Sequence, residues 1–392
     1  MLKFIKHEGG CIGAILFSSL HGVLRHLRCI NNHANGGMMG PIRSKLFIIS
    51  VFMFLFSALN AAPAITLPEL TTRVEKLSRA EREALLIKGA KEEKEVMFYA
   101  TTPVNQVAVL KKAFSARYPF VDLKHYYSPR QGILNKTVSE YRGKANITDV
   151  VMTDVSYGTI LIKEGVSHPY TTPDVQRYVR GSYDPKGYWY TMYMLTTALV
   201  YNRNLVKPGE APKTYQDLLD PKWKGRMMFD PEAAFIMAAM EEVWGKEKAR
   251  DYLARLSKQD LIFRRGTTLT SQLIAAGEHP IAIAVNAETT AEMRDKGAPL
   301  GFSVLPPRII KPNGFFVAKN APHPHAALLF TDWSLSEEGQ KVLAVDLGKG
   351  VAMKGIPAKY KEFQGDPDYV VGPEFGNQLK QHMTEFQKIF GM

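Results

Sequence analysis

The sequence predicts an α/β protein whose sheets are mostly parallel and flanked by helices. Two observations lead to this class: residues 96–154 and 214–296 each alternate short apolar strands with helices. Such alternation implies βαβ units, in which a helix connects two parallel strands. A third observation is the uncharged, aromatic and β-branched segment 188–202 between the two units. It is expected to form two consecutive strands or one long bent strand that crosses between two lobes as a hinge, with a core hairpin as the alternative.

The first unit contains three predicted strands and two helices. The run VMFYAT (96–101) is apolar and β-branched, as buried parallel strands are. Pro103 suits the first turn of a helix, where a fixed φ and a missing N–H cost little. The other strands are predicted over 121–127 and 147–154, and a second helix over 131–141.

The segments after 202 continue the alternation. We predict strands over 224–230, 260–265 and 281–286, and helices over 232–258 (split near Gly245), 268–277 and 287–296. Two further strands, 301–306 and 314–319, enclose a Pro-rich loop, and helices follow over 323–343 and 376–390.

The expected division into lobes follows this order of elements. Lobe one is predicted to comprise residues 65–195 with 287–335. Lobe two is predicted to comprise residues 196–286 with 336–392.

The N-terminal residues have the pattern of a secretory signal. Arg43 and Lys45 precede the uncharged run 46–59, and small residues follow it. A basic region, a short apolar region and small residues define a cleavable signal peptide. We therefore predict a signal peptide over 38–64 and a periplasmic mature protein. Residues 1–37 are interpreted as an upstream extension that is not part of the natural product.

Composition and charge are those of a globular protein with a basic balance. The 392 residues are 45% hydrophobic and 22% charged, with a formal net charge of +12. The basic residues form no Lys/Arg run, so nucleic-acid binding is not indicated. A basic balance instead favours an anionic ligand or a negatively charged membrane surface. Both cysteines, Cys11 and Cys29, precede the predicted signal peptide, and a cysteine-free body suits an oxidising compartment.

Polar residues stand at the ends of the predicted strands of the first unit. In open parallel sheets, ligands bind in the crevice at the carboxyl ends of the strands. The helices that follow present the positive ends of their dipoles to the same crevice. We expect a site for an anion or a highly polar ligand, with one wall made by Thr101, Thr102, Ser128, Arg130 and Asp154. Ordinary loop chemistry and helix capping are the alternative.

A second wall is predicted from the later unit. Arg265 precedes a helix start, where guanidinium and backbone N–H groups suit carboxylate or phosphate oxygens. Arg130 and Arg265 are expected to bind anionic oxygens, and hydroxyl and amide groups to orient the ligand. Asp154 and Glu288 are expected to hold an ammonium group or to cap helix N–H donors. The residues predicted for this wall are Arg265, Thr267, Thr268, Asn286 and Glu288.

Enzyme motifs are missing from the sequence. There is no GxSxG, GxGxxG, Walker A or HExxH pattern. We therefore predict no catalytic residue, no cofactor and no metal site. A secreted hydrolase or transferase on the same scaffold is the enzyme alternative, and it predicts turnover of a bound substrate.

Several runs resemble a known family. The run AALLFTDWSLSEEGQKVLA (326–344) is similar to the late helix pair of family 1 extracellular solute-binding proteins, in particular their ferric-iron branch. The runs EVMFYATT (95–102), DVVMTD (149–154) and LTSQLIAAGEHPIAIAVN (269–286) agree, and the resemblance covers about residues 90–345.

The resemblance implies a function. It implies a type II periplasmic-binding-protein fold, in which crossover strands join two lobes and the ligand is clamped between them. The partners it implies are a small solute and the membrane permease of an ABC importer, and we expect a monomer. Iron-binding members carry adjacent tyrosines after the strand at 281–286, where this chain has Ala287-Glu288-Thr289-Thr290. A small organic anion or zwitterion is therefore our first expectation, and ferric iron the second.

Overall fold

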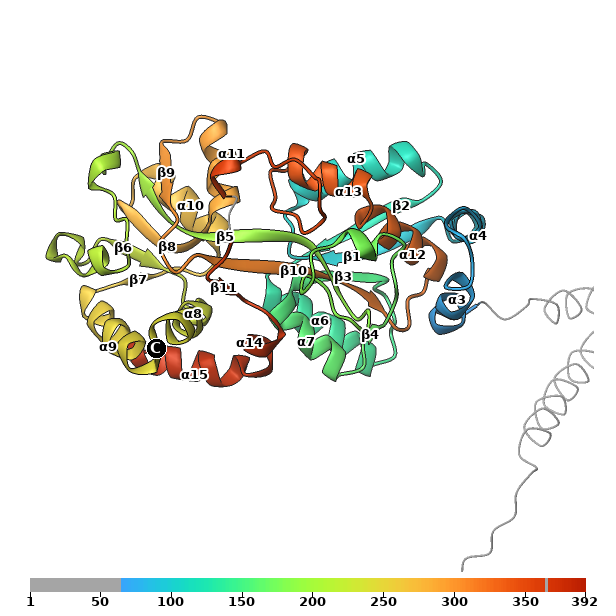
Figure 1. Cartoon of the computed structure of the whole chain (residues 1–392), viewed down its shortest axis with the longest axis horizontal. Coiled ribbons are helices and arrows are strands. Elements are labelled where there is room, and N and C mark those ends of the chain that lie inside the picture. Colours follow the sequence, from blue (N-terminus) through green and yellow to red (C-terminus); the bar gives the residue numbers. More distant parts are fainter. Residues whose placement is uncertain (1–64, 364–365) are drawn as a thin grey trace, which may run out of the picture. The chain divides into compact units, whose positions relative to one another are not determined.

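Two long antiparallel strands, β5 (Tyr190–Asn202) and β10 (Ile309–Ala318), connect the two lobes of the fold (Figure 1). The computed structural model describes residues 65–363 and 366–392, so the predicted extension and signal peptide lie outside the described residues. The first half of β5 pairs with β10, and its second half pairs with β8 and β9. The segment predicted as a crossing is therefore one long strand, with an irregularity between Ala198 and Val200.

Lobe one is organised around three parallel strands. These strands are β1 (Glu95–Ala100), β2 (Asp122–Tyr127) and β3 (Val150–Asp154), in the order β2-β1-β3, followed by the antiparallel β10. Side chains alternate across this sheet, as strand geometry requires. Phe98 packs into the core on one face, and Tyr99 packs into the core on the other.

Lobe two has a smaller sheet of the same kind. Its parallel strands are β6 (Met227–Phe229), β7 (Ile262–Phe263) and β8 (Ile281–Asn286), and β9 (Leu300–Ser303) pairs antiparallel with β5. Two short strands, β4 (Ser167–His168) and β11 (Tyr369–Val370), add to β10. Phe229 and Met228 are buried in separate cores on the two faces of β6.

Helices cover both faces of each sheet (Figure 1). The helices that pack mainly in lobe one are α3 (Leu67–Val74), α4 (Arg79–Glu93), α5 (Val104–Arg117), α6 (Arg130–Arg142), α7 (Val155–Lys163), α12 (Pro324–Ser334) and α13 (Glu337–Lys341). The helices of lobe two are α8 (Ala234–Trp244), α9 (Lys246–Leu256), α10 (Thr267–Ala276), α11 (Ala287–Asp295) and α15 (Leu379–Phe390), and α14 (Pro373–Asn377) packs on α7.

The packing differs from the predicted lobe boundaries in two places. Residues 287–303 contain α11 and β9, which pack on β5 and belong with lobe two rather than lobe one. Residues 337–347 pack into the core of lobe one, where Leu343 is fully buried, rather than into lobe two. The Pro-rich loop between the two strands is shorter than predicted, residues 304–308, because β10 begins at Ile309 and includes Pro312.

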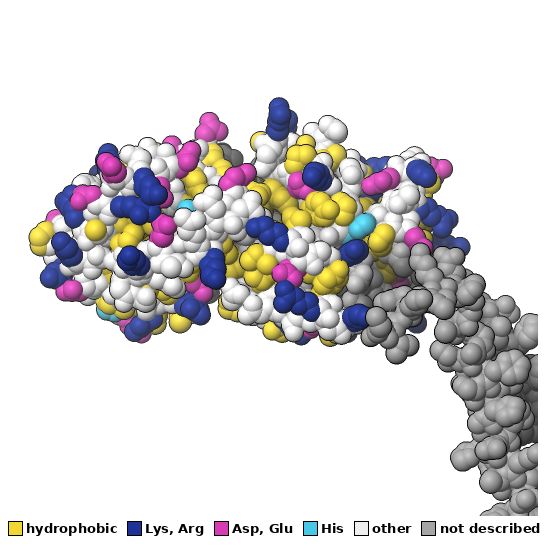
Figure 2. Space-filling view, turned by 90° about the horizontal axis from the view of Figure 1, so that it is seen from below, with side chains coloured by type: hydrophobic (Ala, Val, Ile, Leu, Met, Phe, Trp, Pro, Cys, Tyr) yellow, Lys and Arg dark blue, Asp and Glu magenta, His cyan; other side chains and the backbone are white. Residues whose placement is uncertain are grey.

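The described surface mixes both signs of charge. On the face shown in Figure 2, basic and acidic side chains are interspersed over both lobes. Within residues 65–363 and 366–392, no helix has the length and apolar character that a bilayer crossing requires.

Candidate functional site

A cavity of about 380 Å³ lies between the two lobes, at the carboxyl ends of the parallel strands. Residues that follow β1, β2 and β3 form its first wall, and residues that follow β6, β7 and β8 form the second. The crossover strands contribute Tyr193, Leu195, Lys311 and Asn313 between the two walls. This position is the one at which open α/β sheets bind ligands.

Most of the predicted ligand residues lie at this cavity. Thr101, Arg130 and Asp154 line it from lobe one. The lining residues from lobe two include Arg265, Thr267, Thr268 and Asn286.

Three predicted residues do not line the cavity. Thr102 is fully buried, and its hydroxyl lies 3.0 Å from the phenol oxygen of Tyr193. The Ser128 hydroxyl lies against Gly132 in the first turn of α6. Both carboxylate oxygens of Glu288 accept the backbone N–H of Thr196, at 2.9 and 3.0 Å. Glu288 lines a separate cavity of about 230 Å³, which shares Lys349 with the interlobe cavity.

Five helices begin at the cavity without a side-chain cap. The N-cap residues of α5, α6, α7, α10 and α11 all line the cavity, and none of their side chains accepts a hydrogen bond from its own helix. The first turns of an α-helix carry N–H groups without intrahelical partners and a partial positive charge. The cavity wall is thus electropositive even before its side chains are considered. The N-cap residues concerned are Pro103, Pro129, Asp154, Gly266 and Asn286.

One end of the cavity holds a cluster of ion pairs that joins the lobes. Arg130 Nε from lobe one donates to Glu232 Oε2 from lobe two at 3.0 Å. The same guanidinium lies 3.7 Å from Asp230 and 4.0 Å from Asp154. Burial opposes the charge of Arg130, but these carboxylates outweigh it and raise the pKa of Arg130. Arg265 Nε also binds Glu232, at 3.1 Å, and its side chain is 71% exposed.

A second contact joins the lobes next to the cavity. Gln106 Nε2 of α5 donates to Glu292 Oε2 of α11 at 2.8 Å. Together with the Arg130–Glu232 pair, it connects the two walls directly. The structure therefore represents lobes that contact each other directly.

Two buried lysines also line the cavity. Lys311 and Lys349 are 4% and 5% exposed. Lys311 Nζ donates to Asn286 Oδ1 at 2.7 Å, and the Asn286 amide donates to Thr267 Oγ1 at 2.9 Å. Burial lowers the pKa of Lys311 to about 8 and also lowers the pKa of Lys349.

The residue patterns contain signals for the side chains that the prediction missed. Lys311 is a single charge in the apolar run 309–318, and Lys349 lies between two glycines. Glu232 follows β6 at the type of strand end that was used to choose residues in lobe one. Strand alternation places Tyr126 and Tyr127 on opposite faces of β2. Tyr127 lines the cavity, whereas Tyr126 packs on Tyr99 with ring centroids 5.0 Å apart.

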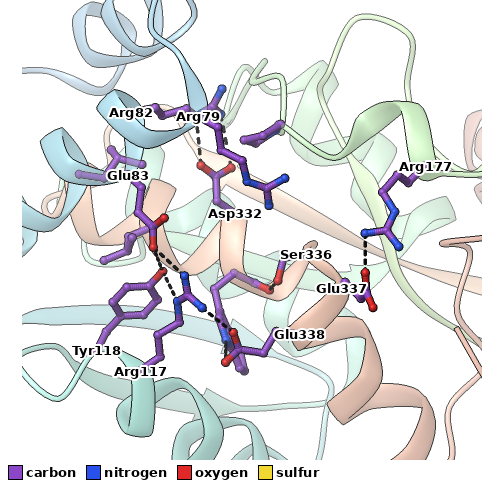
Figure 3. A pocket seen from close by; sticks show the side chains of 14 residues that line it. Arg79, Arg82, Glu83, Arg117, Tyr118, Arg177, Asp332, Ser336, Glu337 and Glu338 are labelled. Atoms are coloured by element: carbon purple, nitrogen blue, oxygen red, sulfur yellow. Dashed lines mark hydrogen bonds and ion pairs between the residues drawn. The ribbon is translucent and has the colours of Figure 1, made fainter.

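A second pocket of about 320 Å³ lies in lobe one, away from these residues (Figure 3). Four arginines line it, and each binds a carboxylate. Arg82 binds Asp332 and Arg117 binds both Glu83 and Glu338, as the dashed lines in Figure 3 show. The remaining pairs are Arg79 with Asp174 and Arg177 with Glu337.

Comparison with known proteins places the chain in a family. A family model of bacterial extracellular solute-binding proteins matches residues 110–370, and the chain belongs to this family. The iron uptake protein A2 of Synechocystis sp. is 25% identical over 206 residues, which is 47% of this chain and 59% of that protein. The chain spans a little over half the length of the first curated relatives it matches.

Solved structures show the same fold. Periplasmic binding protein AfuA from Actinobacillus pleuropneumoniae, with fructose-6-phosphate bound, has a TM-score of 0.66 at 21% identity, over 76% of this chain and 99% of that chain. Iron-bound HitA from Pseudomonas aeruginosa has a TM-score of 0.65 at 20% identity, over 75% of this chain and 99% of that chain. The predicted type II periplasmic-binding-protein fold is confirmed, and the family is one of solute-binding proteins.

Proposed function

We propose that this protein is the periplasmic receptor of an ABC importer and that it binds a small organic anion or zwitterion between its lobes. It releases the solute unchanged to a membrane permease. Family membership and the fold support the receptor class. The charges of the cavity support the class of solute.

The observation that carries the proposal is the convergence of five uncapped helix N-termini and two buried lysines on one cavity. Uncapped N–H groups at helix starts bind anions. The carboxylates in the cavity pair with the arginines, around Arg130. A solute with an anionic group at the lysines and a donor group near these carboxylates satisfies both kinds of charge.

Closure follows from the same arrangement. Helices α10 and α11 belong to lobe two, whereas α5, α6 and α7 belong to lobe one. An anion that accepts hydrogen bonds from both sets favours the closed state over the open one, which is how a ligand shifts such an equilibrium.

Ferric iron is the second candidate, because relatives named for iron uptake and an iron-bound structure are similar to this chain. The cavity favours it less. Two lysines and Arg130 oppose a trivalent cation, and Glu288, at the position of the missing tyrosine pair, faces elsewhere. Burial raises the pKa of Tyr193, which disfavours the phenolate that ferric iron requires. Within the described residues, no group of three or more His, Cys, Asp or Glu side chains is placed to hold a metal.

Native mass spectrometry of the protein purified without refolding tests the proposal. We expect a colourless sample that retains one small organic adduct, which is released unchanged on denaturation. An iron adduct with a visible charge-transfer band would show that the solute is ferric iron and not an organic anion. A chemically altered product would overturn the receptor function in favour of an enzyme.

A further inference from the structure

The two buried lysines of the cavity flank the same crossover strand from opposite sides. Lys311 lies on β10, opposite Leu195 of β5. Next to Lys349, Gly350 exchanges two backbone hydrogen bonds with Met194, at 2.7 and 3.2 Å, on the other edge of β5. Adjacent strands are about 4.8 Å apart, so the two backbones lie roughly 10 Å from each other. Both side chains line the cavity from these positions.

Neither ammonium group has an ion-pair partner among the described residues. Lys311 Nζ donates to the neutral Asn286 amide oxygen and lies 4.9 Å from the centre of the Phe235 ring. Lys349 Nζ lies 5.6 Å from the centre of the Tyr193 ring. Cation–π contacts offset part of the loss of hydration. Burying an ammonium group without a carboxylate is otherwise unfavourable.

The charged groups around Lys311 do not raise its pKa back to the value of an exposed lysine. Burial is the largest effect and lowers its pKa to about 8; Asp154, Asp230 and Glu288 act in the opposite direction, and Arg130 adds repulsion.

Lys349 has a similar environment. Its pKa is lowered by burial and is only partly supported by Glu288 and Glu292. Within the described residues, neither lysine forms an ion pair, whereas every arginine of the pocket in Figure 3 binds a carboxylate.

We infer that the solute carries two negative charges on one group, that this group lies between Lys311 and Lys349, and that its capture takes up a proton from solvent. The inference rests on the proposed function and narrows its class of solute to dianions. Two lysine side chains that line one cavity from opposite sides of β5 can each contribute a positive charge to a doubly charged group. The N–H groups at the start of α10 and α11 complete its hydrogen bonds.

The proton balance is simple. Above about pH 8, the Lys311 amine is mostly neutral in the empty cavity. An arriving dianion favours the ammonium form, so Lys311 Nζ takes one proton from water or buffer and donates it in a hydrogen bond to the anion. No covalent bond to the solute forms or breaks.

Sulfate is a suitable probe, because it stays a dianion across the range tested. We expect sulfate to bind with a dissociation constant that rises about tenfold between pH 7 and pH 9, as the linkage of one lysine with a pKa near 8 requires. Calorimetry in two buffers of different ionisation enthalpy should show proton uptake near one at pH 9 and near zero at pH 6. Chloride at matched ionic strength should not reproduce the binding.

Variants separate the lysines from general charge. Lys311→Met should weaken sulfate binding at pH 7 and abolish its pH dependence. Lys349→Met should weaken sulfate binding but keep its pH dependence. This variant is a second readout if Lys311→Met does not fold. Lys319→Met, at an exposed position just after β10, is the matched control and should change neither.

Equal binding of chloride and sulfate, or a pH dependence that survives Lys311→Met, would overturn the inference. These outcomes are distinguishable from failure of the proposed function. A retained organic monoanion in the native mass spectrum would support the receptor function but contradict the inference that the solute is a dianion. A protein that retains no small molecule and binds no anion would contradict both the receptor function and the dianion inference.

Discussion

The interlobe cavity and the arginine-rich pocket of lobe one have similar volumes, about 380 and 320 Å³, but satisfy their charges differently. In the pocket of lobe one, every arginine binds a carboxylate, and the helices that border it, α4 and α13, are capped by Ser78 and Ser336. In the cavity, the N-cap side chains of five helices accept no hydrogen bond from their own helix, and the two lysines form no ion pair with any described residue.

The charges of the arginine-rich pocket stabilise the fold, whereas the cavity lysines are placed to bind a ligand. The pocket in Figure 3 joins α4, α5 and α12 through internal pairs, so its groups leave little for an added molecule to satisfy. The cavity keeps two buried lysines that form no ion pair within the described residues, which is unfavourable for folding and favourable for binding an anion. Size alone does not distinguish the two sites.

The largest expected effect is on the pocket of lobe one. Arg82 is 7% exposed, and its guanidinium binds Asp332 at 3.1 and 3.3 Å and the Thr171 carbonyl at 2.7 Å. Arg82→Met leaves Asp332 without its cation, and the free energy of unfolding should fall by about 3–5 kcal/mol in urea titrations.

Arg177→Met is the control for this prediction. Its partner Glu337 and Arg177 itself are each about 40% exposed or more, so the loss should stay below about 1 kcal/mol. Equal losses in the two variants would contradict the structural role of the buried pair.

The corresponding change in the cavity should have the opposite sign. Lowering a pKa from 10.5 to about 8 corresponds to roughly 3 kcal/mol of disfavoured charge, and the hydrogen bond to Asn286 returns about 1 kcal/mol. Lys311→Met should therefore raise the free energy of unfolding of the ligand-free protein by about 1–2 kcal/mol at pH 7.

The sign of the pH dependence follows from the lowered pKa. The unfolded chain binds more protons than the folded protein between about pH 8 and 10.5, so wild-type stability rises with pH in that range. The advantage of Lys311→Met should be complete at pH 7 and shrink toward pH 10. A destabilised variant at pH 7 would mean that Lys311 supports folding as Arg82 does.

A smaller effect is expected at a capped helix. The Ser78 hydroxyl accepts the Glu81 N–H at the start of α4, while Glu81 binds back to the Ser78 N–H at 3.0 Å. Ser78→Ala should lower the free energy of unfolding by about 1 kcal/mol and leave sulfate binding unchanged. Ser139→Ala, at an exposed interior position of α6, should have little effect on either measurement.

The smallest effect concerns contact between the lobes. Gln106→Ala removes the 2.8 Å hydrogen bond to Glu292, and the closed state should lose about 0.5–1.5 kcal/mol, seen as weaker sulfate binding in calorimetry. Gln131→Ala removes a hydrogen bond to Asn135 within α6 and should not alter binding. Equal weakening in both variants would show that the interlobe contact is irrelevant to closure.

Much of the fold could be predicted because its signals are local. Apolar strands ended by polar residues, as at 96–101 and 281–286, predicted β1 and β8, and the uncharged run 188–202 predicted the crossing by β5. The pairing of distant segments had no local signal. Only packing against β5 shows that α11 belongs to lobe two, and only the register of β10 shows that Lys311 is buried.

For the candidate site, the positions of several residues could be predicted from the sequence, but their contacts could not. Strand ends identified Thr101, Arg130 and Asp154, because the carboxyl edge of a parallel sheet is a property of the topology. The roles of these residues required coordinates. Three carboxylates from both lobes surround Arg130, and the backbone N–H of Thr196 donates to Glu288, neither of which the sequence indicated.

Anomalous diffraction from crystals soaked in selenate, a dianion with a strong scatterer, tests most directly whether the cavity is the anion site. The account predicts a selenium peak between Lys311, Lys349 and the first turn of α10, and none in the arginine-rich pocket. A peak among Arg79, Arg82 and Arg117, with none between the lobes, would contradict it.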